Sequence, residues 1–178
     1  IEAAKEESIN AILAQSKAKN LDDLLNKKLF ASTVSGGRVK YDDWLKSHQP
    51  FHWLAEYYDI INVNGGFDVI IGNPPYVESS QARKLYKLDS TGYKTLECGN
   101  LYAIVFERCL YITHKHSFTG MIVQLPIVCS ERMNNAQILL VARNSWIYTF
   151  DDRPGKLFDN LEHIRATIFL TTNNEGPV

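Results

Sequence analysis

The feature that most constrains the fold is a short, largely apolar run, Phe67 to Ile71, that stops at Gly72 and is followed by Asn73 and two prolines. A run this short, rich in β-branched side chains, predicts a buried β-strand rather than a helix. Proline fixes φ and cannot donate to a sheet ladder, so the strand cannot continue beyond this point. The sequence therefore predicts a buried strand that ends in a rigid, polar tip.

Strand-like and helix-like segments alternate after this first strand. We expect further strands at residues 121–125, 146–150 and 164–170, and helices at 101–114 and 130–144. Such alternation is typical of an α/β fold with a mostly parallel sheet and helices on its faces. No helical pattern separates the last two strands, so we expect them to pair as an antiparallel hairpin at the edge of the sheet.

The chain divides into a helical N-terminal segment, residues 1–66, and a catalytic part, residues 67–178. Isoleucine and leucine recur at spacings of three and four over residues 3–30, and we expect a break near residues 20–23 because Asn and Asp favour helix caps. Residues 78–99 are polar and lack a clear period, which predicts a long, mobile loop.

The composition limits what the chain can do. Its net charge is −1, so phosphate-binding charge for a nucleic acid has to be local or lie elsewhere. The three cysteines have no CxxC spacing, which argues against a disulfide framework and against a zinc site. No membrane span or signal peptide is visible. The first residue is Ile1 rather than Met, and we expect the chain to be part of a longer protein.

The tip Asn73-Pro74-Pro75-Tyr76 combines an amide side chain, proline carbonyls that only accept hydrogen bonds, and an aromatic ring. The Asn73 side-chain oxygen and the Pro74 carbonyl can each accept one hydrogen of an amino group, while Tyr76 can stack on the ring that carries it. Acceptors already in position need not reorganise during a reaction. A simple strand-ending turn is the plainer interpretation of two prolines, but open α/β sheets bind ligands at this end of a strand.

The stretch FDVIIGNPPYV resembles the catalytic motif of amino-methyltransferases that use S-adenosyl-L-methionine, in their N6-adenine DNA branch. The flanking stretches HQPFHWLAEYYDIINVNGG, GMIVQLPIVCSERM and SWIYTFDDRPGKLFDNLEHIRATIFL are similar to the large type II methylases of restriction–modification systems, including those fused to an endonuclease. The similarity covers most of residues 48–171. It implies a partial Rossmann-like methyltransferase sheet, S-adenosyl-L-methionine as cofactor and double-stranded DNA as substrate.

The resemblance also implies roles for the residues of the tip. Asn73 and Pro74 would hold the target amine, Pro75 would stiffen the tip, and Tyr76 would stack on an adenine flipped out of the duplex. Asn73 would also face the cofactor. Asp68, earlier in the same strand, is expected to support the tip rather than to catalyse.

Three residues of the segment between the last two expected strands complete the candidate site. Phe158 matches the place where relatives put a second aromatic ring against the flipped base, although an ordinary core phenylalanine is an equal alternative. Arg153 and Lys156 flank it and are candidates for contacts with the DNA backbone, although exposed basic residues are usually only solvated. His48 and His52 are expected to be structural and not metal ligands, because Pro50 lies between them and no third ligand is evident.

The cofactor-binding half of such a domain is not evident in the sequence. The family uses a glycine-rich loop after its first strand and an acidic residue after its second, and both are expected upstream of Phe67. Gly36-Gly37 and Gly65-Gly66 do not follow apolar strands. We therefore expect the rest of the parent polypeptide to supply the cofactor-binding half and a target-recognition domain, and the isolated chain to be inactive and to bind the cofactor weakly or not at all.

Two alternatives stay open. An amino-methyltransferase acting on RNA or on a protein glutamine would use the same tip, because an amide NH₂ also offers two donors on a flat group. A non-catalytic interaction module could carry the motif without using it. The flanking stretches PFHW and FDDRPGKLF favour DNA, and with it a cytoplasmic, prokaryotic protein.

Overall fold

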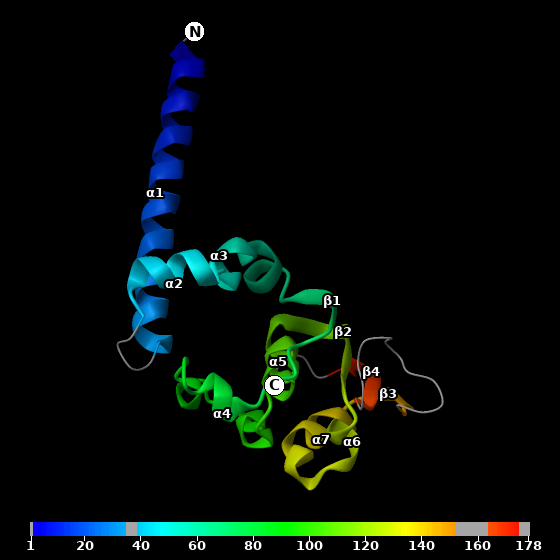
Figure 1. Cartoon of the computed structure of the whole chain (residues 1–178). Coiled ribbons are helices and arrows are strands. Elements are labelled where there is room, and N and C mark those ends of the chain that lie inside the picture. The colour runs from blue at the N-terminus through cyan, green and yellow to red at the C-terminus, as the bar shows by residue number, and fades with distance from the viewer. Residues whose placement is uncertain (1, 35–38, 152–163, 175–178) are drawn as a thin grey trace.

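The computed structural model describes residues 2–34, 39–151 and 164–174 of the chain (Figure 1). Its N-terminal part is helical, as expected. Helix α1 (Glu2–Thr33) projects away from the rest of the molecule, and α2 (Tyr41–His48), α3 (Trp53–Glu56) and a π-helical turn (Asp59–Val63) lead to the sheet.

The helix break expected near residues 20–23 is wrong, because α1 continues through it. Asp23 accepts a hydrogen bond of 2.7 Å from Lys27, one turn further on, and such a pair stabilises a helix rather than ending it. The capping preference of Asp and Asn is therefore outweighed here by the surrounding helical sequence.

Aromatic rings join the N-terminal helices to one another and to the sheet. Trp44 of α2 is buried, and its ring lies 5.4 Å from that of Phe30 in α1. The Tyr57 ring lies 5.2 Å from that of Phe67, the first residue of the sheet. The division between residues 66 and 67 stays a prediction, and this last contact crosses it.

Four strands form one mixed sheet in the order β1-β2-β4-β3. Their bounds are β1 (Phe67–Gly72), β2 (Thr113–Gln124), β3 (Ser145–Phe150) and β4 (Ala166–Asn173). β1 pairs in parallel with β2, and β4 lies antiparallel between β2 and β3, so β1, β2 and β3 all run in the same direction. The α/β class and the antiparallel pairing of the last two strands are confirmed, with β3, not β4, at the edge of the described sheet. The expected mostly parallel sheet with helices on its faces is wrong for the described residues. Of the described strands, only β1 and β2 pair in parallel, because β4 inserts antiparallel between β2 and β3.

Residues 78–99 are not the plain loop that their composition suggests, because they contain α4 (Ser79–Ala82) and two short 3₁₀ helices (Leu88–Ser90 and Lys94–Cys98). The helix predicted at residues 101–114 is confirmed as α5 (Leu101–Ile112). β2 follows α5 directly, eight residues earlier than predicted. Its first half is polar and has no apolar pattern; Thr113 pairs with Phe67 of β1, and the ladder with β4 begins at Ser117. Ser117 and Thr119 are buried although they are polar.

β2 connects to β3 through α6 (Pro126–Cys129), a 3₁₀ turn (Glu131–Met133) and α7 (Asn134–Val141). The predicted helix at residues 130–144 is therefore shorter and begins with a different kind of turn. None of the helices in the described residues is long and apolar enough to cross a lipid bilayer.

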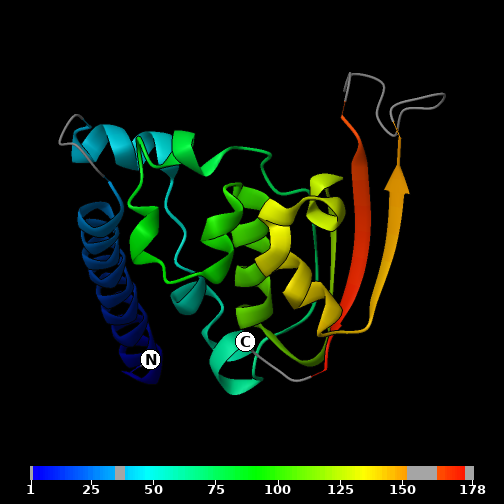
Figure 2. The ribbon, with the colours of Figure 1, turned by 90° about the horizontal axis from the view of Figure 1, so that it is seen from below.

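The core lies between the sheet and the helices α5 and α7, which cover one side of the strands (Figure 2). Phe106 of α5 meets Phe169 of β4 with ring centroids 4.9 Å apart, and both are fully buried. The opposite face of the sheet carries large apolar side chains that the described residues leave exposed. These are Val69, Ile71, Phe118, Trp146, Tyr148 and Leu170.

The turn into β1 depends on a glycine. Gly66 has φ +131°, and a Cβ there would lie 2.6 Å from the backbone nitrogen of His114. A side chain would therefore collide with the start of β2, so this glycine brings the two backbones together at the N-terminal end of β1.

Candidate functional site

The candidate site lies at the end of the sheet where the carboxyl ends of β1, β2 and β3 are found. The parallel pairing puts the carboxyl ends of β1 and β2 together, and Gln124 and Phe150 both pair with Ala166, the first residue of β4. Ligands of open α/β sheets bind at this edge. The sequence prediction that the tip follows directly on a strand is confirmed, because β1 ends at Gly72.

The tip presents one polar side chain on a fixed backbone. Asn73 is exposed, Pro74 is buried and Pro75 is exposed. Within the described residues no hydrogen bond occupies the Asn73 side chain. An amide that is exposed and uncommitted, next to a buried proline whose ring fixes the local backbone, is available to a ligand.

Tyr76 is held in place by its hydroxyl and by its ring. The hydroxyl donates a hydrogen bond of 3.1 Å to the carbonyl of Ile122 in β2. The ring meets that of Tyr102 edge to face, with centroids 6.1 Å apart and planes at 88°. Partial burial raises the pKa of Tyr76, so the phenol stays neutral. The ring is thus a fixed surface and not a free side chain.

The residues after the tip are bonded to the start of α5. The Leu101 amide donates to the Val77 carbonyl at 2.9 Å, and the Ser79 amide donates to the Gly99 carbonyl at 2.8 Å. Between them, Glu78 and Asn100 form an isolated antiparallel bridge. The turn from Asn73 to Glu78 is therefore anchored at its start by β1 and at its end by the α5 N-terminus.

One nitrogen of Arg132, Nη2, donates to both oxygens of the Glu78 carboxylate, with N–O distances of 2.8 and 3.0 Å. Both side chains are 47% exposed. Half-exposed ion pairs of this kind contribute roughly 0–1 kcal/mol to stability, so this one matters for geometry more than for folding.

A buried carboxylate holds the 3₁₀ helix Lys94–Cys98 against α5. Glu107 is only 1% exposed and accepts hydrogen bonds from the Thr95 amide at 2.8 Å, the Thr95 hydroxyl at 2.7 Å and the Lys94 amide at 3.3 Å. A buried carboxylate is stable only when its oxygens are bonded in this way. Glu107 therefore fixes the 3₁₀ helix Lys94–Cys98, and Gly99, directly after that helix, accepts the hydrogen bond from the Ser79 amide.

A hollow of about 310 Å³ opens at the same sheet edge, lined by Gln124, Leu125, Pro126, Cys129, Ile164 and Arg165. Arg165 is paired with Asp151 at 3.1 Å. The hollow lies where β2 ends and β4 begins, one strand away from the tip. Phe158, Arg153 and Lys156 fall within residues 152–163, outside the described residues, so their predicted roles stay predictions.

The described residues do not fit a cradle for S-adenosyl-L-methionine. Gly65 and Gly66 come before β1 and serve the close approach to β2, whereas a nucleotide-type cradle needs glycines after a strand. Gly36 and Gly37 lie outside the described residues. What the described residues present at this end of the sheet is the tip, with the exposed Asn73 side chain.

Asp68 does not support the tip, which corrects the expectation from the sequence. It lies at the beginning of β1, and its carboxylate accepts a hydrogen bond of 2.8 Å from His114. His48 stacks on Trp44, and His52 bonds to the side-chain oxygen of Asn26 at 2.8 Å, which are structural contacts. No cluster of His, Cys, Asp or Glu suited to a metal occurs in the described part of the chain.

The sequence did not reveal the supporting residues Glu78, Arg132 and Glu107. A local signal existed only for Asn100, whose side chain accepts a hydrogen bond from the Tyr102 amide and so caps α5. Asn directly before an apolar helical run is a typical cap signature. Arg132 lies 54 residues from its partner Glu78, and no local pattern joins them.

A family model described as Eco57I restriction-modification methylase matches residues 3–158, from the N-terminal helices through β1, the tip, β2 and β3. No curated protein sequence matches the chain.

Proposed function

Because the chain belongs to the Eco57I restriction-modification methylase family, and so to methylases of DNA, we propose that its tip holds the exocyclic amine of an adenine for N6 methylation. The methyl donor in this proposal is S-adenosyl-L-methionine. The observation that carries it is Asn73, exposed and unbonded within the described residues, beside the buried Pro74 at the carboxyl end of a parallel strand.

In the proposed reaction, the Asn73 side-chain oxygen and the Pro74 carbonyl accept the two hydrogens of the amine. These two bonds draw the nitrogen lone pair out of conjugation with the purine ring and leave it free to attack. When bound by residues outside those described, the cofactor would supply a methyl group on a sulfonium. The N–C bond would form as the C–S bond breaks, the sulfur would leave as a neutral thioether, and the methylated nitrogen would lose one proton to solvent. A cysteine nucleophile is not required, and burial raises the pKa of Cys109 to about 11, which keeps that thiol protonated.

The base has to leave the duplex to reach the tip, because its amine is paired inside the helix. In our proposal Tyr76 supplies the ring on which the flipped adenine stacks. Its hydroxyl bond to Ile122 and its edge contact with Tyr102 support this role, because they fix the ring before the base arrives. Phe158 is the proposed second aromatic, and Arg153 and Lys156 the proposed contacts to the DNA backbone.

The proposal includes a partner segment that binds the cofactor, in the rest of the parent polypeptide. Support comes from the outer side of β1, which pairs with no other strand in the described residues. Ile71 in this strand is 81% exposed, although its pattern is that of a buried strand. A hollow of about 590 Å³ with mainly apolar walls lies between β1, α5 and the aromatic residues Trp53 and Tyr57.

The test is methyl transfer by the longest natural polypeptide that contains this chain. Labelled S-adenosyl-L-methionine is offered with adenine-containing duplex DNA, RNA and protein, and Asn73→Ala is compared with Asn62→Ala, an exposed asparagine in the π-helical turn. We expect N6-methyladenine in DNA, lost in Asn73→Ala and retained in Asn62→Ala. Transfer to RNA or to protein glutamine alone would replace DNA as the substrate, and no transfer at all would contradict the proposal.

A further inference from the structure

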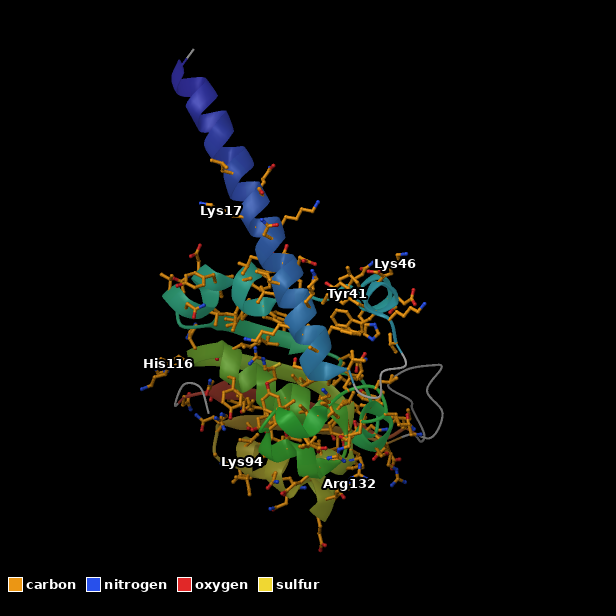
Figure 3. All side chains as sticks on the ribbon, turned by 90° about the vertical axis from the view of Figure 1, so that its left-hand side faces the viewer. Lys17, Tyr41, Lys46, Lys94, His116 and Arg132 are labelled. Atoms are coloured by element: carbon orange, nitrogen blue, oxygen red, sulfur yellow. The ribbon has the colours of Figure 1, made fainter. Side chains whose placement is uncertain are left out.

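Arg132, labelled in Figure 3, lies in the 3₁₀ turn before α7. Its hydrogen bonds connect the residues that follow the tip to those that precede α5. Its Nη2 donates to both Glu78 carboxylate oxygens, and its Nε donates to the Cys98 carbonyl at 2.8 Å. The Asn100 side chain donates to the same carboxylate at 3.4 Å. We call Arg132, Glu78, Asn100 and the Cys98 carbonyl the Arg132 clasp.

The clasp has a geometry that suits arginine in particular. One planar guanidinium reaches three oxygens on two segments, which a lysine ammonium cannot do. Gly99 has φ +71°, and a Cβ there would lie 3.3 Å from the Arg132 Cζ. A side chain at this position would be strained and would press on the guanidinium, so the glycine leaves room for it.

The Cys98 carbonyl of the clasp belongs to a segment that further hydrogen bonds hold in place. Cys98 ends the 3₁₀ helix that Glu107 bonds to α5. The Asn135 side chain in α7 donates to the Lys94 carbonyl and to the Glu97 carboxylate, both at 2.9 Å. The clasp therefore connects Glu78 to a segment that the core itself holds in place.

The ion pair of the clasp consists of the Arg132 guanidinium and the Glu78 carboxylate, both charged at neutral pH. The hydrogen bond from Arg132 lowers the pKa of Glu78, so the carboxylate stays ionised at neutral pH. A charged, bidentate pair is shorter and more directional than a neutral contact.

We propose that Arg132 is a positioning residue, which sets the Asn73 and Pro74 acceptors by fixing Glu78 at the end of the tip. This inference rests on the proposed function. Pro74 and Pro75 fix two of the φ angles between Asn73 and Glu78, which shortens the flexible part of the turn to Tyr76 and Val77, so a displacement of Glu78 shifts the path of the backbone that leads back to Asn73. Because the ion pair is half-exposed, it adds little to folding stability, and its loss acts mainly on the alignment of the amine.

The test compares Arg132→Ala and Glu78→Gln with Arg83→Ala in the intact polypeptide. Arg83 pairs with Asp89 at 3.1 Å in the same connecting segment and has no contact with the tip in the described residues, so it is a matched surface ion pair. We expect Arg132→Ala to lower kcat by about tenfold to a hundredfold. The KM for DNA is expected to change by less than about twofold, because base alignment and not DNA binding is lost. Arg83→Ala is expected to leave kcat unchanged.

Arg132→Lys separates geometry from charge. The variant keeps a positive charge near Glu78 but loses the planar fork, so we expect its kcat to stay closer to that of Arg132→Ala than to the wild type. Recovery of wild-type kcat in Arg132→Lys would show that charge alone suffices, and would overturn the positioning role.

Amide hydrogen exchange gives a readout that does not depend on activity. Ser79 and Leu101 donate the backbone bonds that flank Glu78, and we expect their amides to exchange faster in Arg132→Ala and Glu78→Gln but not in Arg83→Ala. Unchanged exchange, or unchanged kcat in an active parent, would overturn the inference, as would global unfolding of both clasp variants. Faster exchange in the two clasp variants of a parent polypeptide that has no transferase activity would support the structural role of the clasp and would contradict the proposed function.

Discussion

The Tyr76 hydroxyl lies 3.1 Å from the Ile122 carbonyl, so the last residue of the tip is bonded to the strand next to the one it follows. The carboxyl ends of two parallel strands are thereby joined through a side chain as well as through the ladder. The bond fixes the aromatic ring while leaving Asn73 unengaged within the described residues. The tip therefore has an aromatic ring, Tyr76, in a fixed position and an amide side chain, Asn73, that is available to a ligand.

Replacement of Tyr76 separates these two parts. Tyr76→Phe removes the hydroxyl bond but keeps the ring, and we expect it to lose about 1 kcal/mol of unfolding free energy while retaining most methyl transfer. Tyr76→Ala removes the stacking surface, worth about 1–3 kcal/mol per base, and we expect kcat/KM for DNA to fall about tenfold to a hundredfold. Urea unfolding and single-turnover transfer measure the two effects. Equal activity of Tyr76→Ala and the wild type would exclude stacking.

Replacement of Glu107 tests the support beneath the tip. Glu107→Gln exchanges one acceptor oxygen for an NH₂ that faces donors from Thr95 and Lys94, and we expect a loss of about 1–3 kcal/mol of unfolding free energy. Glu56→Gln in the exposed face of α3 is the control, with an expected change below about 0.5 kcal/mol. Denaturant midpoints give both values. A smaller effect at Glu107 than at Glu56 would contradict the structural role.

Two glycines of the first strand region are expected to differ in their tolerance of a methyl group. Gly66→Ala combines a strained φ with contacts of 2.6 Å to the backbone of β2, and we expect a loss of about 2–4 kcal/mol. Gly72→Ala has nothing within 4 Å of its added Cβ, and we expect a change below about 1 kcal/mol. Urea unfolding of both variants checks the prediction, and a stable Gly66→Ala protein would contradict the close approach of the two backbones.

The pair of Asp68 and His114 makes stability depend on pH. The hydrogen bond with Asp68 raises the pKa of His114 above its ordinary 6.5, and the same bond lowers the pKa of Asp68 below its ordinary 3.8. The histidine contribution is complete below pH 6.5 and disappears as the pH rises through the raised value. The aspartate contribution is complete above pH 3.8 and disappears as the pH falls through the lowered value.

Both contributions are therefore present together between about pH 4 and pH 6.5. We expect His114→Gln to cost more unfolding free energy at about pH 5.5 than at about pH 8.5. Lys115→Gln, a change of the exposed neighbouring residue, is the control. A His114→Gln cost that is constant across this range would show that the pair does not form.

Local signals predicted the parts of the fold that local physics determines. Phe67–Gly72 is a strand that stops at prolines, and both facts are visible in adjacent residues. The first half of β2 was missed because its residues are polar and its pairing is with distant segments: Thr113 pairs with Phe67 in β1, and the ladder with β4 begins at Ser117. Where a strand is polar and is formed by pairing with a distant segment, its sequence shows no alternation of apolar and polar residues from which to predict it.

The residues of the candidate site also differ in whether the local sequence reveals them. Asn73 to Tyr76 were predicted because the whole unit is contiguous and its chemistry is in the residue types. Glu78 and Arg132, in contrast, meet only in three dimensions, and each alone looks like an ordinary exposed charge. The expected support from Asp68 was wrong because the residue sits at the opposite end of the strand, where its partner His114 comes from the start of β2.

The uncovered face of the sheet bears on how such a stretch of sequence can be inherited. Trp146, Tyr148 and Leu170 present to water, within the described residues, a surface that a freely diffusing protein would use for self-association. A protein segment that packs on this surface would have to be inherited together with it, because a gene rearrangement that separated the two would leave these side chains open to self-association.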